Sequence, residues 1–479
     1  MGRNQPAREA GLARKGDAEM SATEFAPVPA QAPARDRSGS ARLLGITSLA
    51  HFLNDGVVFF IPVIGDLLSQ GHHVSTAVVT AMLTIFYVTS AGFGIVVGLV
   101  ADALGRRGAM IAVGIATLGV SLLGFYASLS LPGVSSDILV LVAAGVAGIG
   151  SSFYHPLGGS LLQLGFPARS RGRALGINGA FGSLGRALYP ALFFVIAAMG
   201  ISKSATTVVF AVLSVLAAVI VAVGLRPEKL RQPALRPAVV TVAPAPLAGT
   251  DPPGDPASQD PASGVPADPP AKSQPAGVPL RSLLSRSVVA LMSIAFFRSL
   301  AFIGIVAWVP IYLTTDRHAG ISTGLGVAVT AMYAGGIIGQ PVFGLLADRF
   351  DKRFVLAIDS LGAAVGIFLF LATSGHGVTA LLALALFGLF TFSGFPLLMS
   401  LVADYVPKSA STTGNALVWG IGSTGGQALG PLDASLLVGG SVAHLGLAFA
   451  ILGGVSAATV LATPLLQRTT RSSRMAMFG

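Results

Sequence analysis

The apolar positions of this chain form two long blocks, residues 42–225 and 283–467, which polar segments flank and separate. Each block divides into six apolar runs of about 20 residues or more, the length of a helix that crosses roughly 30 Å of hydrocarbon. The alternating runs of about ten residues that membrane β-strands show do not occur. The pattern therefore predicts an all-α integral membrane protein with twelve transmembrane helices in two six-helix bundles.

The twelve predicted spans share high apolarity and few charges. In the first block they are 43–65, 75–100, 108–129, 136–164, 172–199 and 204–225. In the second block they are 286–313, 322–346, 354–373, 377–405, 412–437 and 442–466.

The remaining segments set the domain boundaries. Residues 1–42 have no apolar period and no signal-peptide pattern, so we expect a disordered tail. Residues 226–282 are dense in proline, which neither continues a helix nor fills a strand, and so predict an extended linker. A short polar tail covers 468–479. The two bundles are thus expected at 43–225 and 283–467.

Charged residues are scarce and unevenly placed. They make up 10% of the chain, against roughly 25% in a soluble domain, which argues against a soluble enzyme. With the N-terminus in the cytoplasm, 26 of the 30 Lys and Arg residues fall on the cytoplasmic side. The net charge of +10 is therefore an orientation signal and does not indicate nucleic-acid binding. We expect a plasma (inner) membrane protein with both termini and the linker in the cytoplasm.

The chain contains none of several residue patterns that enzymes require. It has no Cys, which excludes a thiolate nucleophile, a Cys-ligated zinc and an iron–sulfur cluster. It has no phosphate-binding P-loop, no G-x-S-x-G and no H-E-x-x-H. We therefore predict no enzyme activity, no cofactor and no metal site, and an ion or solute gradient as the energy source.

A G-x-x-x-D-x-x-G-R-R/K pattern follows the second span and recurs after the eighth, 246 residues later. The first copy contains Gly98, Asp102, Gly105, Arg106 and Arg107, and the second contains Gly344, Asp348, Lys352 and Arg353. Two copies at matching places in a six-plus-six plan resemble the signature of the major facilitator superfamily. The resemblance implies two pseudo-symmetric bundles that alternate access to a central cavity.

The repeated motif also has a physical interpretation. Glycines allow helices to approach closely, and a carboxylate just past a helix end can cap a neighbouring helix. We interpret Asp102 and Arg106 as a gate clasp, although the motif could instead only fix topology. Asp351 stands where the pattern has Gly, so a weaker turn is expected in the second copy.

Two further motifs resemble the fosmidomycin-resistance branch of that superfamily. The first span contains H-x-x-N-D, and the fourth contains a G-S-S-x-[FY]-H-P sequence that ends at Pro156. The resemblance implies proton-coupled efflux of small drugs, while transporters of sugars and organic anions share the same frame. The Gly-Pro antiporter signature of the fifth span is not intact, because Arg186 stands near its place.

Ionisable groups at membrane depth are expensive and are therefore candidates for function. His51, Asn54 and Asp55 share one helix face at spacings of three and four residues. The resemblance implies that spans 1, 4, 7 and 10 line the cavity, whereas span 9 is peripheral and its Asp359 makes only a local polar contact. Asp55 is the main proton-coupling candidate. The alternative is that Asp55 forms a structural ion pair with Arg186 or Arg298.

The candidate roles divide into two groups. The proton-coupling candidates are Asp55, His51 and His155, and the substrate-binding candidates are Asn54, Arg186, Arg298 and Tyr154. Two arginines against one carboxylate leave the cavity positive, and Arg binds phosphonate or carboxylate in a bidentate manner. The residues therefore favour a small anionic or zwitterionic solute.

The resulting hypothesis is a secondary active transporter, monomeric and in contact with membrane lipid, that exports a small solute or drug in a proton-coupled manner. Proton-coupled or facilitative uptake of an organic anion is an alternative, because one cavity serves either direction. A non-transporting receptor is a third hypothesis, but it predicts an added soluble domain that the sequence does not contain.

Overall fold

The computed structural model describes most of the chain outside the predicted tails and linker. The described residues are 37–72, 75–131, 133–226, 278–309, 312–313, 323–373, 377–438 and 444–468. Residues 1–36, 227–277 and 469–479 lie outside them, so the predictions of a disordered tail and an extended linker remain predictions.

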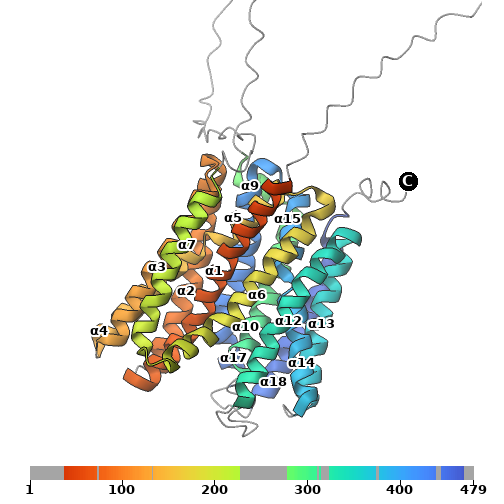
Figure 1. The fold of residues 1–479 in the computed structure, drawn as a ribbon. Helices are drawn as coiled ribbons and strands as arrows, with labels where there is room; N and C mark the ends of the chain where they lie inside the picture. The colour runs from red at the N-terminus through yellow and green to blue at the C-terminus, as the bar shows by residue number, and fades with distance from the viewer. Residues whose placement is uncertain are drawn as a thin grey trace, which may run out of the picture. The chain divides into compact units, whose positions relative to one another are not determined.

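Helices account for nearly all of the described residues (Figure 1). The first half contains α1 (Arg37–His72), α2 (Thr76–Leu104), α3 (Arg107–Ser130), α4 (Val134–Ser151), α5 (Tyr154–Gly165), α6 (Ala168–Ala198) and α7 (Lys203–Gly224). The second half contains α9 (Leu280–Leu283), α10 (Arg286–Val306), α12 (Thr323–Arg349), α13 (Lys352–Ala372), α14 (Gly377–Thr391), α15 (Gly394–Tyr405), η2 (Lys408–Ala410), α16 (Ser411–Asn415), the π-helical η3 (Ala416–Thr424), α17 (Gly425–Val438), α18 (Leu445–Ala458) and η5 (Thr459–Leu465).

Ten helical segments among the described residues are long and apolar enough to cross a membrane. The fifth and eleventh predicted spans are not among these ten, although both are helical. The fifth lies in α6, whose first turns carry Arg169, Arg171 and Arg173. The eleventh is divided among α16, η3 and α17. The predicted all-α architecture is confirmed.

The fourth and tenth spans are each broken at corresponding places. The α4–α5 break precedes Pro156, and the α14–α15 break precedes Pro396, 240 residues later. A proline lacks the N–H that would continue the preceding helical turn, which explains both breaks. They bring His155 and Phe395 together, with 5.6 Å between their ring centroids.

The two halves pack against each other along small residues. Helix α6 runs along α1 and α12, while α2 packs on η3. A Cβ on Gly344 would lie 2.3 Å from the Gly172 carbonyl oxygen, so this close approach of α12 to α6 requires glycine.

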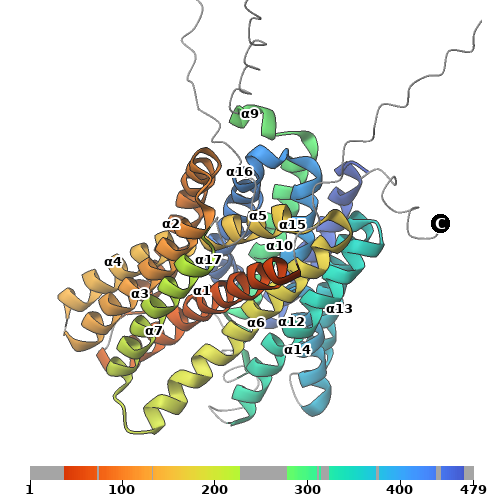
Figure 2. The same ribbon diagram turned by 45° about the horizontal axis from the view of Figure 1, so that its top comes forward.

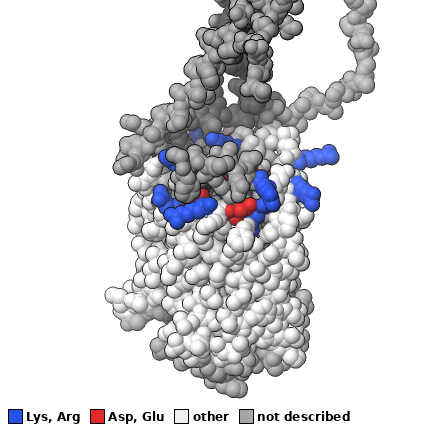
Figure 3. All heavy atoms as spheres, turned by 90° about the vertical axis from the view of Figure 1, so that its right-hand side faces the viewer, with Lys and Arg blue, Asp and Glu red and all other residues white. Residues whose placement is uncertain are grey.

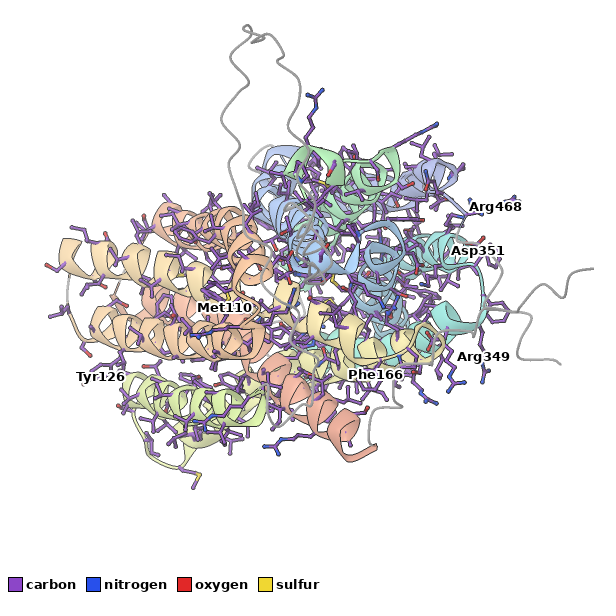
Figure 4. The ribbon with its side chains drawn as sticks, turned by 90° about the horizontal axis from the view of Figure 1, so that it is seen from above. Met110, Tyr126, Phe166, Arg349, Asp351 and Arg468 are labelled. Carbon is purple, nitrogen blue, oxygen red and sulfur yellow. The ribbon has the colours of Figure 1, made fainter. Side chains whose placement is uncertain are left out.

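The loops of the two repeated motifs lie at one end of the molecule, hereafter the motif end. Figure 2, in which this end is turned toward the viewer, shows α5, α15 and α16 close together there. On the face drawn in Figure 3, Lys and Arg side chains gather at one end and the remaining described surface is uncharged. Arg349, Asp351 and Arg468 lie along one edge in the view from above (Figure 4). This distribution is what a membrane-spanning helix bundle requires.

Candidate functional site

A single carboxylate, Asp55 of α1, stands at the centre of a buried polar cluster. Arg186 Nη1 of α6 lies 2.8 Å from its Oδ2, and Asn54 Nδ2 donates to its Oδ1 at 3.0 Å. The Nε2 atoms of His51 and His155 lie 3.3 Å from Oδ2 and Oδ1 respectively. Only 2% of Asp55 is exposed, so its charge depends on these four partners. The helical spacing on α1 thus brings the predicted residues together.

The hydrogen bonds of His51 determine where its protons lie. Its Nδ1 faces the Asn178 carbonyl oxygen at 2.9 Å, and a carbonyl only accepts, so Nδ1 carries a hydrogen. Its Nε2 lies 3.3 Å from Asp55 Oδ2, a contact that is ionic when the ring carries a second proton. A Cβ on Gly182 would lie 2.5 Å from this Nε2, so glycine leaves the room that the pair requires.

A cavity of about 90 Å³ adjoins this cluster. Its lining includes Asp55, His155, Arg186 and Arg298. Aromatic rings form much of the remaining wall, namely Phe59, Phe86, Tyr87, Phe302, Phe392, Phe395 and Trp419. The Arg186 guanidinium lies 4.7 Å from the Phe392 ring centroid, a cation–π distance. The site therefore offers charge at its centre and apolar walls around it.

Arg298 forms an ion pair with a carboxylate of its own half of the chain, whereas the sequence predicted an unpaired arginine in the cavity. Its Nη2 forms an ion pair with Asp359 of α13, which is fully buried. The prediction that Asp359 is peripheral was wrong, because the long Arg298 side chain spans the gap between α10 and α13. The argument for a positive cavity from two arginines against one carboxylate was also wrong, since Arg186 and Arg298 each pair with an aspartate.

Three predicted residues do not line the cavity. The Tyr154 hydroxyl lies 2.8 Å from the Thr47 carbonyl oxygen and 2.9 Å from Asn178 Oδ1, and its single hydrogen is donated between these two acceptors. This side chain, predicted to bind substrate, instead packs against the backbone of α1 and Asn178. Asn54 is fully buried and orients Asp55, which corrects its prediction as a substrate ligand. His51 is buried and contacts three residues that line the cavity, Asp55, His155 and Phe395, without lining it itself.

The first motif ties α2 to the second half of the chain. Asp102 accepts hydrogen bonds from the backbone N–H groups of Thr412 at 3.2 Å and Thr413 at 2.7 Å, at the start of α16. Its ionic partner is Arg107, at 2.6 Å, and not Arg106, which is exposed. The clasp predicted with Arg106 was therefore wrong by one position, because α3 begins at Arg107 and turns that side chain inward.

The second motif makes the reciprocal contact. Asp348 accepts from the N–H groups of Gly172 at 2.7 Å and Arg173 at 2.8 Å, in the first turns of α6. Lys352 pairs with Asp404 of α15 at 2.5 Å. The expected weak turn at Asp351 is not found, since this residue caps α13 by accepting from the Arg353 N–H at 3.0 Å. Each half thus caps a helix of the other.

The glycines of the motifs have distinct roles. Gly105 ends α2 with a φ of 68°, a left-handed conformation that favours glycine. A Cβ on Gly98 would lie 2.8 Å from the Cβ of Ala416, so Gly98 lets α2 approach η3. These contacts agree with the predicted close helix approach.

A seam of polar side chains near the motif end was missed by sequence reasoning. Ser160 and Ser411 hydroxyls lie 2.6 Å apart, and Gln163 Nε2 donates to Asn415 Oδ1 at 2.9 Å. Both bonds join α5 to α16, across the two halves. Their only signal in the sequence is a few hydroxyl and amide residues in apolar runs.

One group could in principle hold a metal ion. His51, Asp55 and His155 place their ligand atoms within 4.8 Å of one another. The Arg186 guanidinium on the same carboxylate opposes a further cation there. The expectation of no metal stays a prediction.

A comparison with protein-family models identifies one family. The family model described as Major Facilitator Superfamily matches residues 44–431 and 319–476. An uncharacterized protein of Archaeoglobus fulgidus is 30% identical over 141 residues, which are 29% of this chain and 64% of that protein.

The similar solved structures share the fold at low identity. The proton:xylose symporter XylE is 14% identical with a TM-score of 0.66, over 92% of this chain and 99% of that chain. The human organic anion transporter MFSD10 is 17% identical with a TM-score of 0.61, over 88% and 99% of the two chains.

Proposed function

The chain belongs to the major facilitator superfamily, and we propose that it moves a small anionic or zwitterionic solute by proton-coupled alternating access. It is a multi-pass membrane protein of a transporter family. The finer statements concern its coupling ion, solute and direction. They are supported by the cluster around Asp55 and by the cavity beside it.

The contact between His51 Nε2 and Asp55 Oδ2, at 3.3 Å, is the observation that supports coupling best. Because His51 Nδ1 already faces the Asn178 carbonyl, this contact is ionic when Nε2 carries a second proton. Asp55 lines the cavity, so that proton lies one side chain from the solute space. A gate movement that separates Arg186 from Asp55 would make the carboxylate bind this proton more tightly.

The charge of the solute sets the direction of coupling. An anion on Arg186 weakens the pairing of Asp55, so anion and proton bind together, as symport and uptake require. A cationic group of a zwitterion near Asp55 instead competes with the proton, as antiport and efflux require. Efflux is favoured by one further observation: His51, Asn54, Asp55 and His155, which carry the fosmidomycin-resistance resemblance, all meet at one point.

Growth of a drug-sensitive host distinguishes these directions. Cells that express the protein are compared on fosmidomycin and on organic acids as sole carbon source, with empty-vector cells as the inactive control and Asp55→Asn as an uncoupled variant. Resistance supports export, and growth on an acid supports uptake. If neither changes relative to the empty-vector cells, the proposal of a small anionic or zwitterionic solute is contradicted.

We propose that the motif end faces the cytoplasm of a plasma (inner) membrane and that the protein works as a monomer. The bias of 26 of 30 Lys and Arg residues supports this orientation. Reporter fusions at Gly71 and Ala257 test it. A cytoplasmic signal at Gly71 would contradict the topology.

A further inference from the structure

Asp359 is a carboxylate that the Asp55 mechanism does not use. It is fully buried on α13, and its ionic partner is Arg298 of α10. Its Oδ1 has no hydrogen-bond partner among the described residues. A buried carboxylate with a single cationic partner depends on that partner to remain ionised.

The ion pair with Asp359 involves only one nitrogen of the Arg298 guanidinium. Its side chain is 8% exposed and lines the cavity. Its Nε and Nη1 atoms are buried and have no hydrogen-bond partner within the described part of the chain. A guanidinium has five donors in a planar fork, so the free donors suit an oxyanion that enters the cavity.

We propose that Asp359 is a second proton acceptor, coupled to the solute through Arg298. An oxyanion on the free side of Arg298 places two negative groups on one positive charge, so Asp359 takes up a proton from cavity water as the anion binds. When the anion leaves, the proton returns to water and the ion pair re-forms. This inference depends on the proposed anionic solute. Because the proton and the anion bind together, it belongs to the symport and uptake alternative, and it gives the second half of the protein a coupling carboxylate of its own.

Other charged or titratable groups do not replace Arg298 in this role. The elements packed on α13 are α12, α14, α15, α18 and η5. Their charged or titratable side chains among the described residues are Tyr333, Asp348, Arg349, Asp404 and Tyr405. Asp348 caps α6 and Asp404 pairs with Lys352, both at the motif end, while Tyr333 packs on Phe59. Asp359 therefore senses the cavity mainly through Arg298.

The test measures thermal stabilisation of the full-length purified protein by succinate, methylphosphonate and fosmidomycin at pH 5.5 and 7.5. For wild type, an anion is expected to stabilise more at the lower pH. Asp359→Asn removes the competing charge, so the excess of stabilisation at pH 5.5 over pH 7.5 should become smaller than in wild type, with the remainder due to Asp55. Arg298→Gln should lose the stabilisation at both pH values.

A second measurement tests the inference even if Asp359→Asn does not fold. Calorimetry in buffers of different ionisation enthalpy counts the protons taken up with the anion, and Asp55→Asn should still take up part of the wild-type number. Unchanged pH dependence in folded Asp359→Asn, or no proton uptake in Asp55→Asn, overturns the role of Asp359. No stabilisation of wild type by any of the three anions overturns the anionic solute itself, and with it this inference.

Discussion

Replacing Asp102 with Asn should open the motif end. In the structure this carboxylate accepts two backbone N–H groups at the start of α16 and the Thr413 hydroxyl, and it pairs with Arg107. A helix cap is worth about 1 kcal/mol, and a hydrogen bond to a charged group about 1.5–3 kcal/mol. An amide keeps one acceptor oxygen, so we expect a net loss of about 2 kcal/mol for the closed state. This corresponds to an increase of about 30-fold in the ratio of open to closed molecules.

The absence of Cys from the chain makes the assay direct. Ser411→Cys places one thiol in the seam, where Ser411 is 4% exposed and contacts Ser160. In the purified protein, a maleimide should label this thiol slowly, because labelling requires the motif end to open. Adding Asp102→Asn should raise the labelling rate roughly in proportion to the open population, by about 10-fold or more.

Two carboxylates provide matched controls. Asp348→Asn removes the reciprocal cap on α6 and should have an effect of similar size. Asp137→Asn changes the first turn of α4, away from the motif loops, and should have none. An unchanged labelling rate in Asp102→Asn would refute the clasp and leave the motif as a topology signal.

Three further changes test other parts of the account. Gly388→Ala would place a Cβ 1.7 Å from the Met332 carbonyl oxygen and should abolish the monodisperse peak in detergent chromatography, whereas Gly454→Ala, with no neighbour within 4 Å, should not. Arg298→Ala should weaken binding of an anion by about 10-fold or more and that of a neutral analogue much less, as direct binding measurements can show. Deletion of 240–275 should leave transport near the wild-type rate, and loss of transport with normal membrane insertion would contradict the linker prediction.

The fold was predictable because two kinds of information in the sequence agree. Apolar runs of spanning length predict helices, and the repeated motif around Asp102 and Asp348 predicts two related halves. The exact division of the eleventh span into α16, η3 and α17 was not predictable, because apolar composition is the same for α- and π-helical turns. The breaks before Pro156 and Pro396 were not predictable from proline alone, because Pro62 of α1 and Pro341 of α12 lie inside unbroken helices.

The site was predictable only where its residues are close in sequence. His51 and Asp55 share a helix face at a spacing of four, and the structure places them in contact. The pairing of Arg298 with Asp359 joins two helices whose relative rotation the sequence does not encode in any local pattern. Whether Arg107 or Arg106 pairs with Asp102 depends on the residue at which α3 begins, and the sequence does not predict this to within one residue.

Proteoliposome uptake with and without a pH gradient tests whether Asp55 binds the coupled proton. Asp55→Asn should lose gradient-driven accumulation of the solute identified by the growth assay, while exchange of that solute across the membrane continues. Asp137→Asn, reconstituted in the same way, should accumulate like wild type. Full gradient-driven accumulation by Asp55→Asn would contradict the account and leave Asp55 as a structural partner of Arg186.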